Sequence, residues 1–404
     1  MGVVSPVGNN VESYWNSLVN GVCGIGPIDC EGAGQLPAKV WARVKDFRAD
    51  EQGIDAVFAR KQDKFTVYAL ATANQAMKQA GLVSGENIDP SRLAVYYGTG
   101  IGGLESIVDE TLKMDREGAK WVSPQFIPAM IPNMAAGQIA IRHNARGAAF
   151  SLATACATST NTIGEAYRAI KHGYADAIIC GGSEAVSIPI CVAAFGNMRA
   201  LTKADDPQRA SIPFDADRGG FVLGEGAGAL VLESYDHAVK RGATILAEIC
   251  GYGATCDASH PTAPRADGLT QAAAIKEAAR QAKLCGRRDV IYVNAHGTGT
   301  PLNDKCETLA LHLALGRNAK KAHVSSTKSM TGHLLGAAGA IEAVASVMAL
   351  RTGVIPPTIG LQNQDPACDL DYTPNRAVKA NPTIALSDSL GFGGHNACIA
   401  FRKL

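Results

Sequence analysis

The sequence has no Cys-x-x-Cys pair, and its cysteines are odd in number: eleven are scattered from Cys23 to Cys398. A disulfide framework or a structural zinc site would need thiols paired at short spacing. The pattern therefore favours a reduced, cytosolic chain in which most thiols are small buried side chains. At most one cysteine is expected to be reactive.

The chain also has almost no net charge and no long uninterrupted apolar run. Its 38 basic and 37 acidic residues give a formal charge of +1, whereas a dedicated nucleic-acid-binding protein is usually clearly basic. We find no signal peptide. The apolar run Leu334–Leu350 is short and contains Glu342, which indicates a buried helix rather than a membrane span. Neither a nucleic-acid nor a membrane partner is expected.

Motifs for nucleotide and metal chemistry are absent or incomplete. The sequence contains no P-loop and no HExxH motif. Gly98–Gly103 (GTGIGG) matches GxGxxG after a strand-like run, but a dinucleotide site would need a second strand ending in an acidic residue roughly 20 residues on. Leu104–Glu117 predicts a helix there instead. A nicotinamide-dependent dehydrogenase is therefore a weak alternative, which an NADH titration would exclude.

The residues that are present predict a folded α/β protein. Apolar residues make up 47% of the 404 and charged residues 19%, enough for a substantial core. Strands are predicted at 92–97 and 175–180, and helices at 161–172 and 271–283. This alternation favours an α/β fold with much parallel sheet.

Two segments share one order of elements. Ala149–Ile170 and His323–Val344 each run from a β-rich stretch through a turn of small residues into a helix. The pattern fits a duplicated unit with one site between its copies, and it fits equally two unrelated β-turn-α elements. The polar junction Lys240–Thr244 predicts a boundary between residues 1–242 and 243–404. Because no low-complexity linker separates these halves, we expect them to share a tight interface.

Cys156 is the candidate nucleophile. It stands among small residues (TACATS) between a strand and a helix. A thiolate at a helix N-terminus is stabilised by the dipole and by free backbone N–H groups, so we expect a lowered pKa. For a cysteine taken at random, a buried structural role is the commoner explanation.

Two histidines lie at similar turns. His296 and His333 each follow a strand-like run, and Thr298 and Thr300 come shortly after the first of them. Either histidine alone is more often an ordinary turn residue. Together with Cys156, however, they predict an active site. The glycines of the run Ser387–Asn396 either allow the backbone to come close to a ligand or simply form a hairpin loop.

Taken together, four motifs resemble the β-ketoacyl-acyl-carrier-protein synthases, and most closely the type II elongating condensing enzymes. They are TACATS around Cys156, NAHGTGTPLND around His296, KSMTGHLLGAAGAIE around His333 and GFGGHN near the C-terminus. Pro213–Glu233 and Lys240–Gly253 strengthen the likeness, which covers nearly the whole chain. The resemblance implies a thiolase-like fold, with duplicated halves in five α-β-α-β-α layers, and a homodimer.

The resemblance also implies an acyltransferase mechanism. Cys156 would take an acyl group from acyl carrier protein, with the backbone N–H groups of Cys156 and Phe392 as the oxyanion hole. Neutral His296 and His333 would stabilise the enolate left by decarboxylation of malonyl-acyl-carrier-protein. Lys328 and its partner Glu342 would order His333. No metal or redox cofactor is implied, because the phosphopantetheine arm arrives on the carrier protein.

Further roles follow from the same motif positions. Thr298, Thr300 and Thr262 would bind the pantetheine arm or substrate, Phe392 would gate the pocket, and Ile101 would line the acyl tunnel. Docking of the acidic carrier protein would use a basic patch, for which the matching residues are Lys61, Lys64, Lys120 and Arg199.

Three departures from the family pattern stand out. A short hydrophobic strand normally precedes the position of Met1, so we expect either an upstream start or a truncation that leaves unpaired backbone groups. Leu390 replaces a usual aromatic residue, which could loosen the gate. Asp388 replaces a usual Asn, beside a candidate monovalent-cation site formed with Asn294, Glu342 and Ser387.

The sequence is compatible with competing functions. A free-standing polyketide ketosynthase shares the same motifs. A degradative thiolase would use a second catalytic cysteine, but the surroundings of Cys398 (GHNAC) do not match that motif. A non-catalytic subunit that only docks carrier protein usually lacks the nucleophile, whereas Cys156 is present.

Overall fold

The computed structural model describes residues 1–284 and 288–404, and it is built around two five-stranded sheets. The strand order of the first sheet is β1 (Gly2–Val4), β7 (Gly226–Glu233), β6 (Ala177–Glu184), β4 (Leu93–Gly98) and β5 (Ala149–Phe150). The order of the second is β10 (His323–Ser325), β9 (Ile291–Asn294), β13 (Ile384–Gly391), β14 (His395–Arg402) and β8 (Glu248–Cys256).

The two sheets have the same topology. In the first, β4 is parallel to β5 and β6, while β7 is antiparallel to β6 and β1. In the second, β9 is parallel to β10 and β13, while β14 is antiparallel to β13 and β8. The two segments with a common order of elements therefore occupy equivalent places, as β5–α7 and β10–α14. The duplication is confirmed; the boundary at 242/243 stays a prediction.

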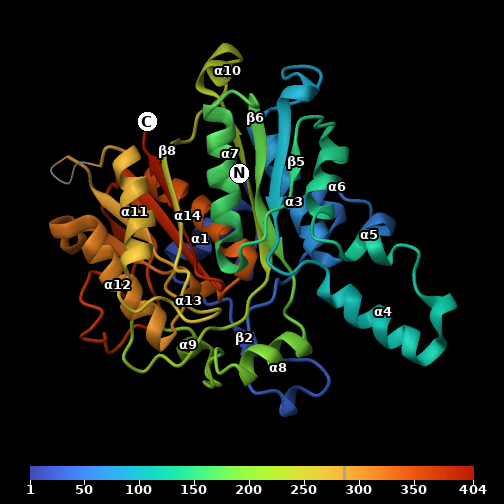
Figure 1. Cartoon of the computed structure of the whole chain (residues 1–404), viewed down its shortest axis with the longest axis horizontal. Coiled ribbons are helices and arrows are strands. Elements are labelled where there is room, and N and C mark those ends of the chain that lie inside the picture. The colour runs from blue at the N-terminus through green and yellow to red at the C-terminus, as the bar shows by residue number, and fades with distance from the viewer. Residues whose placement is uncertain (285–287) are drawn as a thin grey trace.

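Helices form three layers around the sheets (Figure 1). The central layer is α7 (Thr158–Lys171) and α14 (Ala338–Thr352), which pack against each other and against strands of both sheets. The outer layer on the first sheet is α3 (Lys64–Ala80) and α6 (Met134–His143), and that on the second is α11 (Leu269–Gln281) with α12 (Pro301–Leu315) beside it. The expected five-layer, thiolase-like fold is confirmed.

The central helix α14 shows why this layering suits the sequence. The stretch Leu335–Thr352 is long and apolar enough to cross a membrane by composition alone, yet 83% of it is buried inside the protein. A helix that is apolar on all sides needs partners on all sides, and two sheets supply them. The prediction of a buried helix is confirmed.

The remaining elements connect this framework. The other helices are α1 (Val11–Val19), α2 (Ala56–Ala59), α4 (Leu104–Glu117), α5 (Phe126–Met130), α8 (Pro189–Asn197), α9 (Pro207–Ala210), α10 (Tyr235–Lys240) and α13 (Lys328–Thr331). The short strands β2 (Gly26–Pro27) and β3 (Val40–Trp41) pair with each other, as do β11 (Val354–Ile355) and β12 (Val378–Lys379). Helix α4 projects from the body (Figure 1).

The predicted elements are found with small shifts. Strands 92–97 and 175–180 correspond to β4 and β6, and helices 161–172 and 271–283 to α7 and α11. The helix predicted after the GTGIGG run is α4, as expected. At the N-terminus, Gly2–Val4 pair with Ala227–Ala229 at the edge of the first sheet. The strand expected before Met1 stays a prediction.

Candidate active site

Cys156 lies in a tight turn at the start of α7. The turn is the 3₁₀ segment Ala155–Ala157, in which Ala155 has the left-handed φ of 50°. The Thr158 hydroxyl closes the turn by accepting the Thr154 N–H (2.8 Å) and donating to the Ala155 carbonyl (2.8 Å). Gly391 packs closely against this turn. A Cβ added at Gly391 would lie 3.3 Å from the Cys156 nitrogen and 2.7 Å from the Thr154 carbonyl oxygen.

The Cys156 thiol is buried and protonated at rest. Burial raises its pKa to about 12, although the charge of Lys328 and the backbone N–H groups of Phe392 and Cys156 act in the opposite direction. The prediction that the helix N-terminus lowers this pKa is therefore wrong, because desolvation outweighs the dipole at a site only 7% exposed. The same two N–H groups lie close to the sulfur, and their role as an oxyanion hole stays a prediction.

The two histidines stand face to edge beside this thiol. Their ring centroids are 5.3 Å apart and their planes meet at 87°. Both rings are buried, and burial together with the charge of Lys328 holds both pKa values well below the usual 6.5. Each Nδ1 is buried without a hydrogen-bond partner in the described part of the chain. Both side chains are therefore neutral imidazoles, as the mechanism needs.

Different backbone contacts position each histidine. The His296 and Gly297 N–H groups donate to the two carboxylate oxygens of Glu307, at 2.6 and 2.8 Å. The His333 N–H donates to the Val222 carbonyl (2.7 Å), and the His333 carbonyl accepts the Gly224 N–H (2.9 Å). The His333 ring also meets Phe221 edge-on, with centroids 5.2 Å apart. Both rings are thus fixed through the main chain rather than by their own nitrogens.

One cavity of about 530 Å³ collects most of the predicted site residues. Those that line it are Ile101, Cys156, Arg199, Thr262, His296, Thr298, Thr300, His333 and Phe392. Thr298 and Thr300 lie close together, with hydroxyls 3.1 Å apart. Lys328 and Glu342 form an ion pair in which both side chains are 1% exposed, and they lie behind this lining.

Comparison with known proteins identifies this arrangement. Residues 1–238 match the family described as "Beta-ketoacyl synthase, N-terminal domain", and residues 246–362 match its "C-terminal domain". The chain belongs to the β-ketoacyl synthase family. It is 47% identical to a "3-oxoacyl-[acyl-carrier-protein] synthase 2" of Synechocystis sp., over 100% of this chain and 96% of that relative. A Staphylococcus aureus (strain COL) protein of the same name is 45% identical, over 100% and 97%.

Solved ketosynthases have the same fold. "The ishigamide ketosynthase/chain length factor" is 34% identical, with a TM-score of 0.92 over 100% of this chain and 97% of that one. The structure titled "AntDE:AntF (apo): type II PKS acyl-carrier protein in complex with its ketosynthase bound to the hexaketide" is 32% identical, with the same TM-score and the same coverage.

The predicted docking residues of this β-ketoacyl synthase are spread over several elements. Lys61 is exposed before α3, and Lys64, the first residue of α3, pairs with Glu105 on α4 at 2.9 Å. Lys120 is exposed beyond the end of α4, with its ammonium 5.4 Å from the Trp121 ring centroid. Arg199 lines the cavity. A common docking role for the four stays a prediction.

Sequence reasoning missed Glu184. This carboxylate is fully buried at the end of β6, and burial raises its pKa to about 7. It accepts hydrogen bonds from the Thr99 hydroxyl and from the N–H groups of Gly100, Ile101 and Gly336, at 2.9 to 3.2 Å. It therefore joins the turn that carries Ile101 to the turn before α14. An acidic residue that ends an otherwise uncharged strand (AIICGGSE) was the available signal.

Glu307 was missed as well, and it lies against Asp388. Burial raises both pKa values, that of Asp388 to about 7, and each carboxyl group also affects the other. The charge of Asp388 adds to the rise in the Glu307 pKa, because two carboxylates close together away from water disfavour each other's ionisation. Glu307 lies in the first turns of α12, the helix that follows His296, on a face that is buried in the structure; no short motif marked it.

The candidate monovalent-cation site is rich in oxygen atoms. Buried oxygens without a hydrogen-bond partner among the described residues belong to Asn294, Glu342, Ser387 and Asp388. Amide, hydroxyl and carboxylate oxygens are suitable ligands for a hard cation. In the described part of the chain, no cluster of three or more His, Cys, Asp or Glu side chains could hold a metal ion. These oxygens are of the kind that an alkali cation binds, and a cation site here stays a prediction; Asp388 adds a carboxyl group where an amide is usual.

Proposed function

We propose that this β-ketoacyl synthase is a 3-oxoacyl-acyl-carrier-protein synthase that elongates fatty acyl chains by decarboxylative condensation. The observation that carries the proposal is the pair of neutral, perpendicular histidines in one cavity with a buried cysteine. Full-length relatives at 45–47% identity bear this name. Both substrates are thioesters of acyl carrier protein.

In the first half-reaction Cys156 becomes acylated. Its sulfur attacks the acyl carbonyl, the bond from that carbon to the pantetheine sulfur breaks, and the thiol proton passes to the departing thiolate. The N–H groups of Cys156 and Phe392, which face the thiol, stabilise the negative oxygen. A donor of this kind contributes about 10²–10³ in rate.

In the second half-reaction the malonyl unit loses CO₂. The electron pair of the broken C–C bond forms an enolate, whose oxygen accepts hydrogen bonds from His296 and His333. The enolate carbon then attacks acyl-Cys156, the carbon–sulfur bond breaks, and the thiolate takes up a proton. Neutral imidazoles suit this role, because each can donate from one nitrogen without first losing a proton.

Lys328 does not line the active-site cavity but is buried next to residues that do. Its ammonium is paired with Glu342 and lies close enough to lower both histidine pKa values. We assign to this pair the task of keeping the histidines neutral and His333 ordered. An alkali cation at the neighbouring oxygen cluster would support the same framework, and no redox cofactor takes part in either step.

The other cavity residues bind different parts of the substrate. Thr298, Thr300 and Thr262 contact the pantetheine arm, while Ile101 and Phe392 border the acyl chain. Ile101 packs in the apolar cluster that includes Cys156, which supports this assignment. Lys61, Lys64, Lys120 and Arg199 attract the acidic carrier protein through long-range electrostatics.

We further propose that the protein acts as a homodimer in the cytoplasm. Strand β5 lies at the edge of the first sheet with both residues exposed, Phe150 among them at 54%. An open sheet edge with an exposed aromatic side chain favours pairing with a second copy. The described cysteines are all unbridged, which suits a reducing compartment. Light scattering after gel filtration tests the dimer.

A polyketide ketosynthase is the second candidate, because one of the two similar structures has "type II PKS" in its title. These structures are 32–34% identical, against 45–47% for the fatty-acid relatives. The experiment is to incubate the protein with a medium-chain acyl-acyl-carrier-protein, measure intact mass, and then add malonyl-acyl-carrier-protein. We expect a Cys156-dependent acyl adduct that disappears as a saturated-chain 3-oxo product, two carbons longer, forms.

The other outcomes of this experiment are distinct. No adduct on the folded protein would contradict the nucleophile and favour a carrier-protein-docking subunit. Repeated extension without reduction of the keto group would favour the polyketide function.

A further inference from the structure

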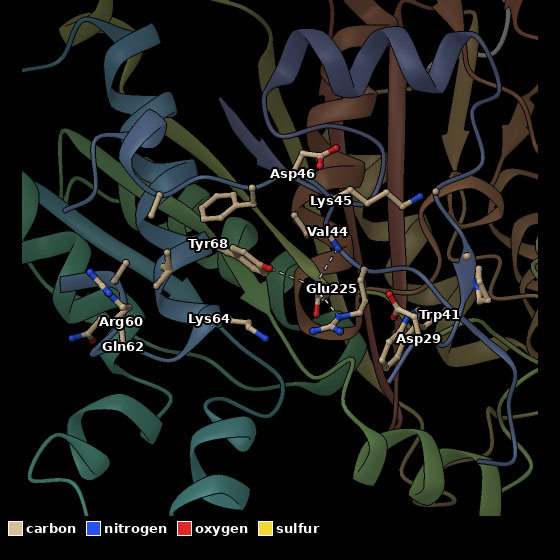
Figure 2. Close-up of a pocket in the computed structure, with 18 residues that line it drawn as sticks. Asp29, Trp41, Val44, Lys45, Asp46, Arg60, Gln62, Lys64, Tyr68 and Glu225 are labelled. Atoms are coloured by element: carbon tan, nitrogen blue, oxygen red, sulfur yellow. Dashed lines mark hydrogen bonds and ion pairs between the residues drawn. The ribbon is translucent and has the colours of Figure 1, made fainter. Parts of the chain in front are cut away.

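A second cavity, of about 780 Å³, shares no lining residue with the active site. Its walls come from the loop after β3, from the start of α3 and from Glu225, just before β7 (Figure 2). A cavity of this volume has the size of a small-molecule site. Of its lining residues, the proposed function uses only Lys64, which is assigned to carrier-protein docking.

Charged side chains surround this cavity, and cations are in the majority. Its lining includes the cations Arg43, Lys45, Arg60 and Lys64 and the carboxylates Asp29, Asp46 and Glu225. Of the carboxylates, Glu225 is 3% exposed and already accepts the Val44 N–H (3.1 Å) and the Tyr68 hydroxyl (3.4 Å). Because Lys64 is already paired with Glu105 at 2.9 Å, the charges of the lining nearly balance, and attraction of an anionic ligand depends on Arg43, Lys45 and Arg60.

Arg43 is the group best placed to bind that anion. Its guanidinium lies 4.7 Å from the Trp41 ring centroid and 3.9 Å from the Glu225 carboxylate. Within the described residues it makes no hydrogen bond, so its N–H fork is free for a carboxylate or phosphate. Phe47 and Tyr68, edge to face at 5.0 Å, add an apolar wall for the rest of the ligand.

A backbone bridge connects this cavity to His333. On one side of the segment 222–225, the Ala42 N–H donates to the Leu223 carbonyl (2.8 Å) and the Glu225 N–H to the Ala42 carbonyl (3.1 Å). On the other side the same segment makes both main-chain hydrogen bonds of His333 described above. A Cβ on Gly224 would lie 2.9 Å from the Thr331 carbonyl oxygen. Because the packing is this close, a displacement of the 222–225 segment also displaces the main chain around His333.

We propose that this cavity binds a single-headed organic anion, a carboxylate or phosphate monoester on a short apolar body, through Arg43, and that its occupancy adjusts His333. The anion accepts hydrogen bonds from the guanidinium N–H groups of Arg43, and this weakens the attraction between Arg43 and Glu225. Glu225 and its neighbours in the 222–225 segment then shift against the main chain of His333. Binding is independent of the proposed condensation, and only the rate measurement below rests on it.

The binding test uses the fluorescence of Trp41, one of three tryptophans in the chain. Octyl phosphate and octanoate are titrated into the protein, with 1-octanol as the neutral probe of equal length. We expect a saturable change with at least one anion, loss of the signal in Trp41→Phe, and affinity lowered about tenfold or more in Arg43→Gln, the loss of one charge-assisted pair. Arg43→Lys keeps the charge without the fork and should be intermediate.

Matched controls make this result decisive. Arg116→Gln removes an exposed charge on α4 and should bind as the wild type does, and thermal unfolding verifies that each variant is folded. Equal binding of octanol, equal affinity in folded Arg43→Gln or Arg43→Lys and wild type, or no saturable change would overturn the assignment. Whichever anion binds more tightly identifies the headgroup.

The coupling test measures the malonyl-dependent step at saturating anion. We expect a rate change of about fivefold, a typical magnitude for linked sites, in the wild type and none in Arg43→Gln. Binding without any rate change would refute the link to His333 and leave the cavity assignment in place. Absence of condensation with or without anion would count against the proposed function alone.

Discussion

The turns that precede α7 and α14 are equivalent in the two halves, but they are put to different uses. Each begins with a non-glycine residue of left-handed φ, Ala155 at 50° and Leu335 at 48°. The next residue is Cys156 in one and Gly336 in the other. A strand end from the opposite half packs on each turn: β6 ends at Glu184 beside Gly336, and β13 ends at Gly391 beside Cys156.

The difference lies in what happens to the turn's backbone N–H. Glu184 accepts the Gly336 N–H at 3.0 Å, so that donor is occupied. Gly391, at the equivalent strand position, has no side chain, and the Cys156 N–H is left to face the thiol. One fold thus makes a closed structural turn and an open catalytic turn, and a single side chain at the end of a strand decides which. Four experiments test this comparison.

The largest effect should come from the nucleophile. Cys156→Ser should lower condensation by about 10³-fold or more, because the hydroxyl lacks the nucleophilicity of the thiol. Product formation by mass spectrometry measures this. Cys256→Ser removes an exposed thiol outside the turn and should leave the rate unchanged. A comparable loss in this variant would contradict the assignment of Cys156 as the nucleophile.

Gly391→Ala should close the open turn. The new methyl group would lie 2.7 Å from the Thr154 carbonyl oxygen and 3.3 Å from the Cys156 nitrogen, so it displaces the oxyanion donors. We expect acyl transfer to slow by about 10²–10³-fold while the protein stays folded. Stopped-flow acylation with circular dichroism checks both. Gly219→Ala meets open space and serves as the control; an unaffected Gly391→Ala rate would refute the comparison.

Glu184→Gln should open the closed turn at a cost in stability. The amide NH₂ of Gln would point at N–H groups whose hydrogen bonds the carboxylate accepts in the wild type. Because these hydrogen bonds would be lost, the free energy of unfolding should fall by about 2 kcal/mol. Chemical denaturation at neutral pH measures it. Glu165→Gln, which removes one exposed ion pair, should change stability by less than about 0.5 kcal/mol. Equal stability of Glu184→Gln and the wild type would mean that the closed turn does not depend on this carboxylate.

The smallest effect is a pH dependence of stability. His296 and His333 have pKa values well below 6.5 in the folded protein, whereas in the unfolded chain they titrate near 6.5. Below that pH these two side chains bind protons in the unfolded state but not in the folded state, so their contribution to stability falls as pH falls. From pH 6.5 to 5.5 each should cost about 1 kcal/mol. A double His→Asn variant should lose this slope; an unchanged slope would mean that the pair titrates normally.

Much of the site followed from residue types at turns. The thiol, both histidines and the two threonines were predicted from short motifs, and the structure brings them into one cavity. The lowered pKa of Cys156 was predicted wrongly, since a dipole is visible in the sequence but the extent of burial is not. Glu184 and Glu307 were missed because their partners are backbone N–H groups from segments that only the fold brings near.

The sequence by itself determined the alternation of strands and helices, the apolar helix α14 and the residue types at each turn, because these depend on neighbours along the chain. The tertiary structure decided which N–H groups stay free, which histidines are neutral, and that a short bridge joins Glu225 to His333. Those properties depend on desolvation and on contacts between residues far apart in the chain, such as Glu184 and Gly336, which only the packing of the two halves creates.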